Sequence, residues 1–137
     1  MLFDPPYKII IIDDDAEILS IMSLIINKNY SESAIVHPFP TFKEGFDYIS
    51  KNDVHVVFID LNLLDEDGMK GIEKLKEMNK KYQIVAFSSD TDLSVKLACY
   101  NSGSDFFLEK PIDRNILNEV IDDALRTFIH WKKITKG

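Results

Sequence analysis

Five short apolar runs alternate with five segments of helical periodicity along this chain of 137 residues. Each run is typical of a buried strand, and a predicted helix follows every one of them. Strands and helices that alternate in this way form right-handed βαβ units around a parallel sheet, with helices on both of its faces. A sheet covered on both faces needs strands that are apolar almost throughout, as these are. The pattern therefore predicts a single α/β domain.

The predicted strands cover residues 8–12, 34–37, 54–59, 83–87 and 106–108. Three predicted helices cover about 15–28, 91–100 and 113–131. The other two are marked by their inward apolar positions, which are Phe42, Phe46 and Ile49 for the second helix and Ile72, Leu75 and Met78 for the third. Thr41 and Glu44 predict a capping box, and Pro38 and Pro40 predict a break after the second strand.

Composition limits the function classes open to the chain. The formal net charge is −7 and the lysines and arginines are scattered, so direct nucleic-acid binding is not expected. The chain is 28% charged and its apolar runs are too short to span a membrane, so no membrane association is expected. The first residues lack the pattern of a signal peptide, and Cys99 is the only cysteine, so a cytoplasmic location is expected.

Carboxylates follow two of the apolar runs. Asp13, Asp14 and Asp15 close the first run, and Asp60 closes the third. In a parallel α/β sheet the carboxyl ends of the strands lie along one edge, where such folds build their sites. Carboxylates gathered there repel one another unless a cation lies between them, and Mg2+ prefers oxygen ligands and often recruits a phosphate. The sequence thus predicts a magnesium site, with Asp15 serving as a helix cap.

Two further polar groups are expected at the same edge. Ser88 and Ser89 end the fourth strand, and Lys110 with Pro111 follows the fifth. No pairing of His with Ser or Cys accompanies them. A central carboxylate beside a metal, a hydroxyl and a lysine suits phosphoryl transfer onto Asp60 as an acyl phosphate. The metal and Lys110 would then balance the incoming negative charge.

This order of residues resembles the receiver domain of two-component response regulators, over about residues 7–127. The resemblance implies a flavodoxin-like three-layer (βα)5 sandwich, with a five-stranded parallel sheet of order 2-1-3-4-5. It implies that Asp13 and Asp14 are the acidic pair, with Asp14 a direct ligand of Mg2+ or Mn2+. Asp60 is then the phosphoacceptor and a further ligand, and the backbone carbonyl of Asn62 completes the protein's share of the metal shell.

The resemblance also implies how the site would act. Ser88 would hydrogen-bond one phosphoryl oxygen and Lys110 would pair with another, while Phe107 occupies the position of the switch aromatic residue. Asn62 and Asp90 flank the phosphoryl site and would tune the lifetime of the acyl phosphate. Because both are polar and able to position water, we expect a short lifetime.

The chain departs from the pattern of this family at two positions. Leu64 stands where the family commonly has Pro, although Asp67 and Gly68 after it are kept. The expected effect is on the stiffness of the loop. Ser88 replaces the commoner Thr and retains the hydroxyl, so the switch is expected to work.

The function implied is a signalling switch with intrinsic autophosphorylation and autodephosphorylation, not a metabolic enzyme. It would accept a phosphoryl group from a sensor histidine kinase or a phosphotransfer protein. Its readout face would be the fourth helix, fifth strand and fifth helix, around Thr91 to Tyr100, Phe107 and Asp113 to Leu125. That face would contact a downstream effector or form a homodimer.

Two alternatives remain open at this point. One is a Mg2+-dependent phosphatase of the haloacid dehalogenase type, which also uses an Asp nucleophile. That family has a second acid two residues later, where this chain has Asn62, and the chain lacks a cap insertion. The other is a receiver-like adaptor that binds partners without being phosphorylated. The complete set of acidic residues argues against it.

The last predicted helix is apolar beyond the usual end of a receiver, at Phe128, Ile129 and Trp131. Residues 128–137 are therefore either a slightly long helix whose aromatic residues pack back on the domain, or a linker or dimerisation helix toward an output domain. Trp131 favours the second. The receiver is taken as one domain over 1–137, acting alone or cut from a longer regulator or hybrid kinase.

Overall fold

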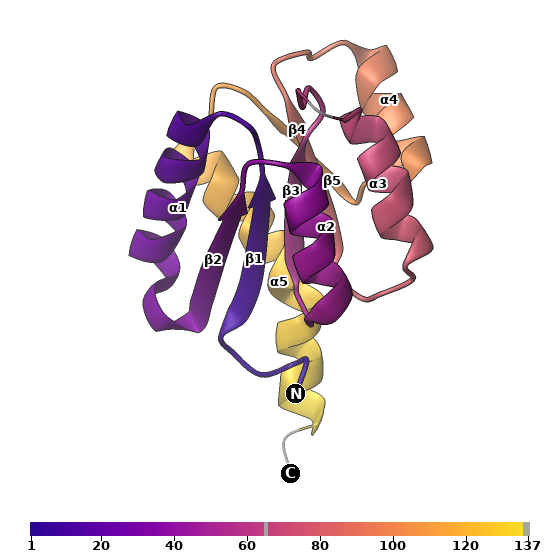
Figure 1. Cartoon of the computed structure of the whole chain (residues 1–137). Helices are drawn as coiled ribbons and strands as arrows, with labels where there is room; N and C mark the ends of the chain where they lie inside the picture. Colours follow the sequence, from indigo (N-terminus) through magenta and orange to yellow (C-terminus); the bar gives the residue numbers. More distant parts are fainter. Residues whose placement is uncertain (65, 136–137) are drawn as a thin grey trace.

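The computed structural model describes residues 1–64 and 66–135 as one parallel sheet flanked by helices (Figure 1). The strands are β1 (Tyr7–Ile12), β2 (Ala34–Phe39), β3 (Val56–Asp60), β4 (Gln83–Ser88) and β5 (Phe106–Glu109). The helices are α1 (Ala16–Tyr30), α2 (Phe42–Lys51), α3 (Gly68–Glu77), α4 (Leu93–Ser102) and α5 (Arg114–Thr135), with a short 3-10 turn at Ser31–Ser33.

Helices cover the sheet on both faces and make three layers. One core cluster joins the sheet to α1 and α5 through residues such as Met22 and Ile121. The second joins the opposite face to α2, α3 and α4 through Phe42, Ile72 and Cys99. The prediction of a flavodoxin-like (βα)5 sandwich is confirmed, and the strand order is β2-β1-β3-β4-β5 as expected.

The strand register brings the carboxyl ends of the strands to one edge. Ile12 at the end of β1 pairs with Ile59, and Asp60 at the end of β3 pairs with Phe87 of β4. Ser88 in turn pairs with Glu109 at the end of β5. The residues that follow these pairs therefore emerge side by side, as the alternation of strands and helices predicts.

The predicted break at Pro38 is wrong, because β2 continues through it to Phe39. Pro38 lies opposite Ile11 of β1, and β2 stands at the edge of the sheet that the described residues form. An edge strand tolerates proline, since the missing N–H can point away from the sheet. Local sequence does not tell an edge strand from a central one, which explains the error.

Other element boundaries move by a few residues. The third strand runs from Val56 to Asp60 and not from residue 54, and α4 begins at Leu93. Met78, expected to face inward on α3, is the half-buried cap residue after that helix. The Thr41 hydroxyl accepts a hydrogen bond from the backbone N–H of Glu44, which confirms Thr41 as the cap of α2.

The helix α5 continues four residues beyond the predicted end. Phe128 is buried in the core, and Trp131 stacks on Phe3 of the amino-terminal segment at 6.2 Å between ring centroids. Lys132 forms an ion pair with Asp4 in the same segment. A role for this extension as a linker to an output domain stays a prediction, and residues 136–137 lie outside the described part of the chain.

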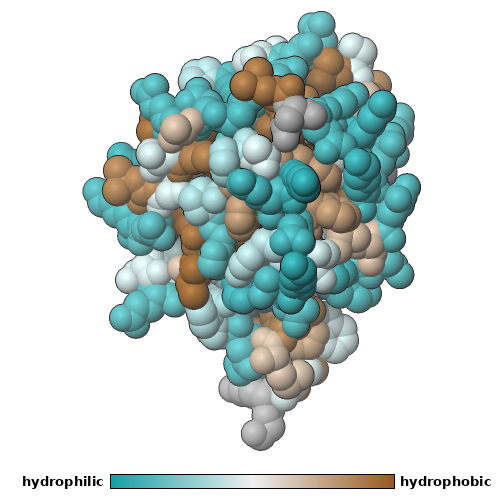
Figure 2. Space-filling model, viewed as in Figure 1, coloured by the Kyte–Doolittle hydropathy of each residue, from teal (hydrophilic) through white to brown (hydrophobic). Residues whose placement is uncertain are grey.

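On the face shown in Figure 2, hydrophilic side chains predominate and apolar ones form small separate patches. Among residues 1–64 and 66–135, no helix combines the length and the apolar character that crossing a membrane requires.

Candidate functional site

Three carboxylates meet where β1 and β3 end. Asp13 and Asp60 are 0% and 3% exposed, and Asp14 is half-buried at the rim. One oxygen from each of the three lies within 4.8 Å of the others. Oxygen atoms at this spacing form a donor set that suits a hard divalent cation such as Mg2+. The structure thus brings together the three acidic side chains that the sequence predicts as metal ligands.

Lys110 supplies the nearby positive charge. Its Nζ lies 3.1 Å from Oδ2 of Asp13 and 3.4 Å from Oδ2 of Asp60. The backbone N–H of Lys110 donates to the carbonyl of Ser88 at 2.9 Å, which fixes the start of its side chain beside the end of β4. The ammonium also lies 4.9 Å from the centroid of the Phe87 ring. One lysine therefore offsets part of the charge of three carboxylates.

Burial raises the pKa of Asp13, and the charge of Asp60 raises it further. A hydrogen bond from the backbone N–H of Asp15 and the pairing with Lys110 act in the opposite direction without cancelling the effect of burial. The ionised form of Asp13 is thus held at a cost in the metal-free protein. A bound cation would remove that cost.

Replacing Asp13 with Asn is expected to stabilise the metal-free protein at neutral pH, by on the order of 1 kcal/mol. Because folding raises the pKa of Asp13, its contribution to stability is full below the unfolded pKa near 3.8 and is lost as the pH rises through the folded value. Urea unfolding without Mg2+ should therefore show a stability gap between variant and wild type that widens from pH 4 to pH 7. If the difference in unfolding free energy narrows from pH 4 to pH 7, the ionised Asp13 carboxylate is not destabilising in the metal-free protein.

Asp15 has a different task from its two neighbours. Its side chain accepts hydrogen bonds from the backbone N–H groups of Glu17 and Ile18 and so caps α1. This confirms the predicted cap, and it separates Asp15 from the three clustered carboxylates.

Gly68 lets the loop after β3 return close to the phosphoacceptor candidate. A Cβ on Gly68 would lie 2.3 Å from the backbone oxygen of Asp60 and 2.5 Å from Cα of Leu61. Both are backbone atoms, so relief requires the loop itself to shift. The Gly68 N–H also donates to the Leu61 carbonyl at 3.3 Å, which closes the loop.

Gly68→Ala is therefore expected to destabilise the protein by about 2 kcal/mol, the usual range for forcing atoms into a filled space. Urea unfolding measures the loss. Leu64→Ala is the matched control in the same loop, because the Leu64 side chain is 91% exposed. Equal stabilities of the two variants would show that the loop adapts to the added methyl group.

Ser88, at the end of β4, is the residue predicted to hydrogen-bond a phosphoryl oxygen. It is 1% exposed, and its Oγ accepts a hydrogen bond from the backbone N–H of Asp90 at 3.0 Å. A serine hydroxyl that accepts one hydrogen bond can still donate its own proton. Asp90 is exposed, and its carboxylate accepts from the N–H of Asp92, so it holds the turn after β4. The roles of both residues toward a phosphoryl group stay predictions.

Phe107, the predicted switch residue, is half-buried on β5. Nζ of Lys96 lies over the face of its ring, 5.8 Å from the ring centroid. The ring also borders a hollow of about 450 Å³ that Lys110 and Ile116 line. The hollow gives the ring open space on the predicted readout face. Movement of Phe107 in response to the site stays a prediction.

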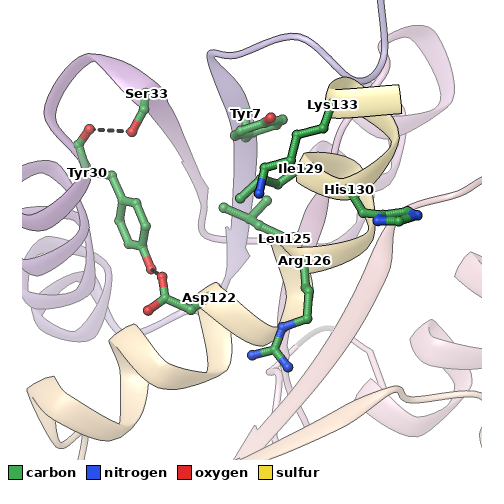
Figure 3. Close-up of a pocket in the computed structure, with 9 residues that line it drawn as sticks. All are labelled: Tyr7, Tyr30, Ser33, Asp122, Leu125, Arg126, Ile129, His130 and Lys133. Carbon is green, nitrogen blue, oxygen red and sulfur yellow. Dashed lines mark hydrogen bonds between the residues drawn. The ribbon is translucent and has the colours of Figure 1, made fainter. Parts of the chain in front are cut away.

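A second hollow, of about 460 Å³, lies near the amino ends of β1 and β2, whereas the clustered carboxylates lie at the carboxyl ends of β1 and β3 (Figure 3). Tyr7, at the start of β1, and Tyr30, at the end of α1, line it together with residues of α5 between Asp122 and Lys133. In Figure 3 the hydroxyl of Tyr30 points to the carboxylate of Asp122, and Lys133, near the end of α5, lines the same hollow. The lining of this hollow does not include the clustered carboxylates Asp13, Asp14 and Asp60 or the neighbouring Lys110.

Three hydrogen bonds, two at His55 and one at Leu64, have no clear signal in the sequence. His55 is buried, its Nδ1 accepts from the Lys8 N–H and its Nε2 bonds the Leu2 carbonyl, and burial lowers its pKa. At the site itself, the N–H of Leu64 donates to Oδ2 of Asp14 at 2.9 Å. The only signal for this bond was the absence of a proline at position 64.

Comparison with known proteins adds to this geometry. The family model described as the response regulator receiver domain matches residues 9–122. The transcriptional regulatory protein GlrR of Escherichia coli is 26% identical over 120 residues, which cover 88% of this chain and 26% of GlrR. The regulatory protein VanR of Enterococcus faecium is 28% identical over 105 residues, covering 76% of this chain and 43% of VanR. The chain thus spans less than half the length of these relatives.

Solved structures share the fold. A receiver domain protein from Methanospirillum hungatei superposes with a TM-score of 0.80 at 24% identity, over 89% of this chain and 95% of that one. The receiver domain of a LuxO repressor protein from Vibrio parahaemolyticus gives a TM-score of 0.84 at 14% identity, over 97% and 98% of the two chains. At these identities the likeness concerns the fold.

Proposed function

Because the chain belongs to the family of response regulator receiver domains, we propose that it accepts a phosphoryl group on Asp60 with the help of Mg2+ or Mn2+. The observation that carries this proposal is the meeting of Asp13, Asp14 and Asp60 with Lys110 at one edge of the sheet. The donor set fits the metal, since it consists of carboxylate oxygens close together and only partly compensated by one lysine.

Each residue of the site has a separate role in this proposal. Asp13, Asp14, Asp60 and the backbone carbonyl of Asn62 would hold the metal, which supplies positive charge for the phosphoryl oxygens when it is bound. Asp60 is the nucleophile, and its attack on phosphorus displaces the oxygen or nitrogen of the donor. Lys110, already 3.4 Å from Asp60, would pair with a phosphoryl oxygen.

The hydroxyl of Ser88 would donate to another phosphoryl oxygen, which gives the site a means to signal its state. In this proposal Ser88 moves toward the phosphate and Phe107 moves with it, shifting an existing equilibrium between two states. The readout face is α4, β5 and α5, and it would bind an effector or a second copy of the chain. Asn62 and Asp90 would position the water that ends the signal.

The proposed partner is a phosphohistidine of a sensor kinase or of a phosphotransfer protein. A cytoplasmic location forms part of the proposal, since that is where such donors act. The relatives GlrR and VanR are named as regulatory proteins and are much longer than the matched region, so any output activity belongs to segments beyond this match.

The test is to incubate the protein with Mg2+ and acetyl phosphate and to measure the intact mass. We expect one added phosphoryl group, which should not form when Mg2+ is chelated before acetyl phosphate is added. Beryllofluoride, which mimics an acyl phosphate, should bind under the same conditions and covers the case of a short-lived adduct. Absence of both products would favour an adaptor that binds without phosphorylation, and multiple turnover of a generic phosphate ester would favour a phosphatase.

A further inference from the structure

The contact of Leu64 with the site is made by its backbone. The Leu64 side chain is 91% exposed, so it contributes little to packing. Its N–H, in contrast, donates to Oδ2 of Asp14 at 2.9 Å, a bond between residues 50 positions apart in sequence. The residue therefore joins the loop after β3 to the turn after β1.

The loop is built to aim amide groups at the carboxylates. Asn62 pairs with Asp67 in an isolated antiparallel bridge, which folds the loop back on itself. The N–H of Asn62 donates to Oδ1 of Asp60 at 3.2 Å. The N–H groups of Asn62 and Leu64, two residues apart in this loop, thus each donate to a carboxylate oxygen of a proposed metal ligand. Asn62 bonds Asp60, and Leu64 bonds Asp14.

We propose that the Leu64 N–H is a positioning group that presets Asp14 for the metal. The inference rests on the proposed function and deepens it. The bond to Oδ2 restrains the orientation of the Asp14 carboxylate, in which one oxygen lies within 4.8 Å of an oxygen of Asp13 and one of Asp60. The same bond sets the separation between Asp14 and the carbonyl of Asn62, which lies two residues earlier in the loop.

A hydrogen bond that orients a metal ligand raises the affinity for the metal. A ligating carboxylate that is already oriented loses less conformational freedom when the metal binds, and groups that orient metal ligands typically contribute 10- to 100-fold to metal affinity. This orientation of the ligand favours binding of the cation.

Residue type at position 64 decides whether this bond exists. Proline has no backbone N–H, so a proline there cannot donate to Asp14. Any other residue can. The departure from the family pattern at Leu64 thus has a consequence for the metal ligand, beyond the stiffness of the loop that the sequence alone suggests.

The test is a calorimetric titration of the wild type, Leu64→Pro and Leu64→Ala with Mg2+ alone. We expect Leu64→Ala to keep the wild-type dissociation constant within about twofold, because it keeps the N–H. Leu64→Pro should raise the dissociation constant about tenfold, the lower end of the usual range for groups that orient a metal ligand. Urea unfolding without Mg2+ shows whether Leu64→Pro is folded.

A second variant separates the lost N–H from the rigidity of proline. An ester in place of the amide before residue 64, introduced as the α-hydroxy analogue of leucine, removes the donor and keeps the side chain. It should weaken Mg2+ binding as Leu64→Pro does. Wild-type affinity in the ester protein would overturn the inference, and so would an equal loss in Leu64→Ala. A wild type that binds no Mg2+ would instead overturn the proposed function.

Discussion

Asp60→Asn is expected to abolish the phosphoryl adduct entirely. The amide that replaces the carboxylate is a poor nucleophile and cannot form an acyl phosphate, while its shape lets the buried position at the end of β3 stay filled. Intact mass after incubation with acetyl phosphate and Mg2+ should show the unmodified chain. The circular dichroism spectrum should match that of the wild type.

Asp15→Asn provides the matched control for this experiment. It also replaces one Asp with Asn near the same edge, but Asp15 caps α1 and lies outside the carboxylate cluster. Asn caps helices about as well as Asp. The control should therefore be phosphorylated like the wild type. An adduct on Asp60→Asn of the same yield would place the modification on another residue.

Lys110→Met is expected to have the second largest effect, on both reaction rate and stability. Removing the ammonium leaves Asp13 and Asp60 without their cation and leaves the incoming phosphoryl group without a partner. Loss of one group that stabilises developing charge typically lowers a rate by about 100-fold. Because the Lys110 side chain is 18% exposed, the loss of stability should be about 2 kcal/mol, below the range for fully buried pairs.

The rate is measured as the initial appearance of the phosphorylated mass, and the stability by urea unfolding without Mg2+. Lys96→Met is the control, since Lys96 pairs with Glu109 on the surface and such pairs contribute little. If Lys110→Met and Lys96→Met behave alike in both measurements, Lys110 is not part of the reacting site.

The sequence was sufficient to predict which residues gather at the site. Apolar runs locate the strands, and parallel strands end at one edge, so Asp13, Asp60 and Lys110 are predicted together without any knowledge of their distances. The core follows from the same periodicity, because strands covered on both faces leave no polar positions between residues 9 and 12.

Contacts that depend on the path of the backbone were beyond such reasoning. The bond from the Leu64 N–H to Asp14 joins two loops, and loop conformation has no hydrophobic period from which to read it. The continuation of β2 through Pro38 depends on its place at the edge of the sheet, which is a property of the whole topology. His55 is buried by the amino-terminal segment, through the carbonyl of Leu2, and not by its own strand neighbours alone.

The proposed function requires that Asp60 itself carries the phosphoryl group. Acyl phosphates are reduced by borohydride to the alcohol, so a phosphorylated aspartate becomes homoserine and keeps a permanent mark. The protein should be treated with acetyl phosphate and Mg2+, reduced with borohydride, digested and mapped by mass spectrometry. We expect homoserine at position 60 and unchanged Asp13 and Asp14. Homoserine at either of those positions, with Asp60 intact, would contradict it.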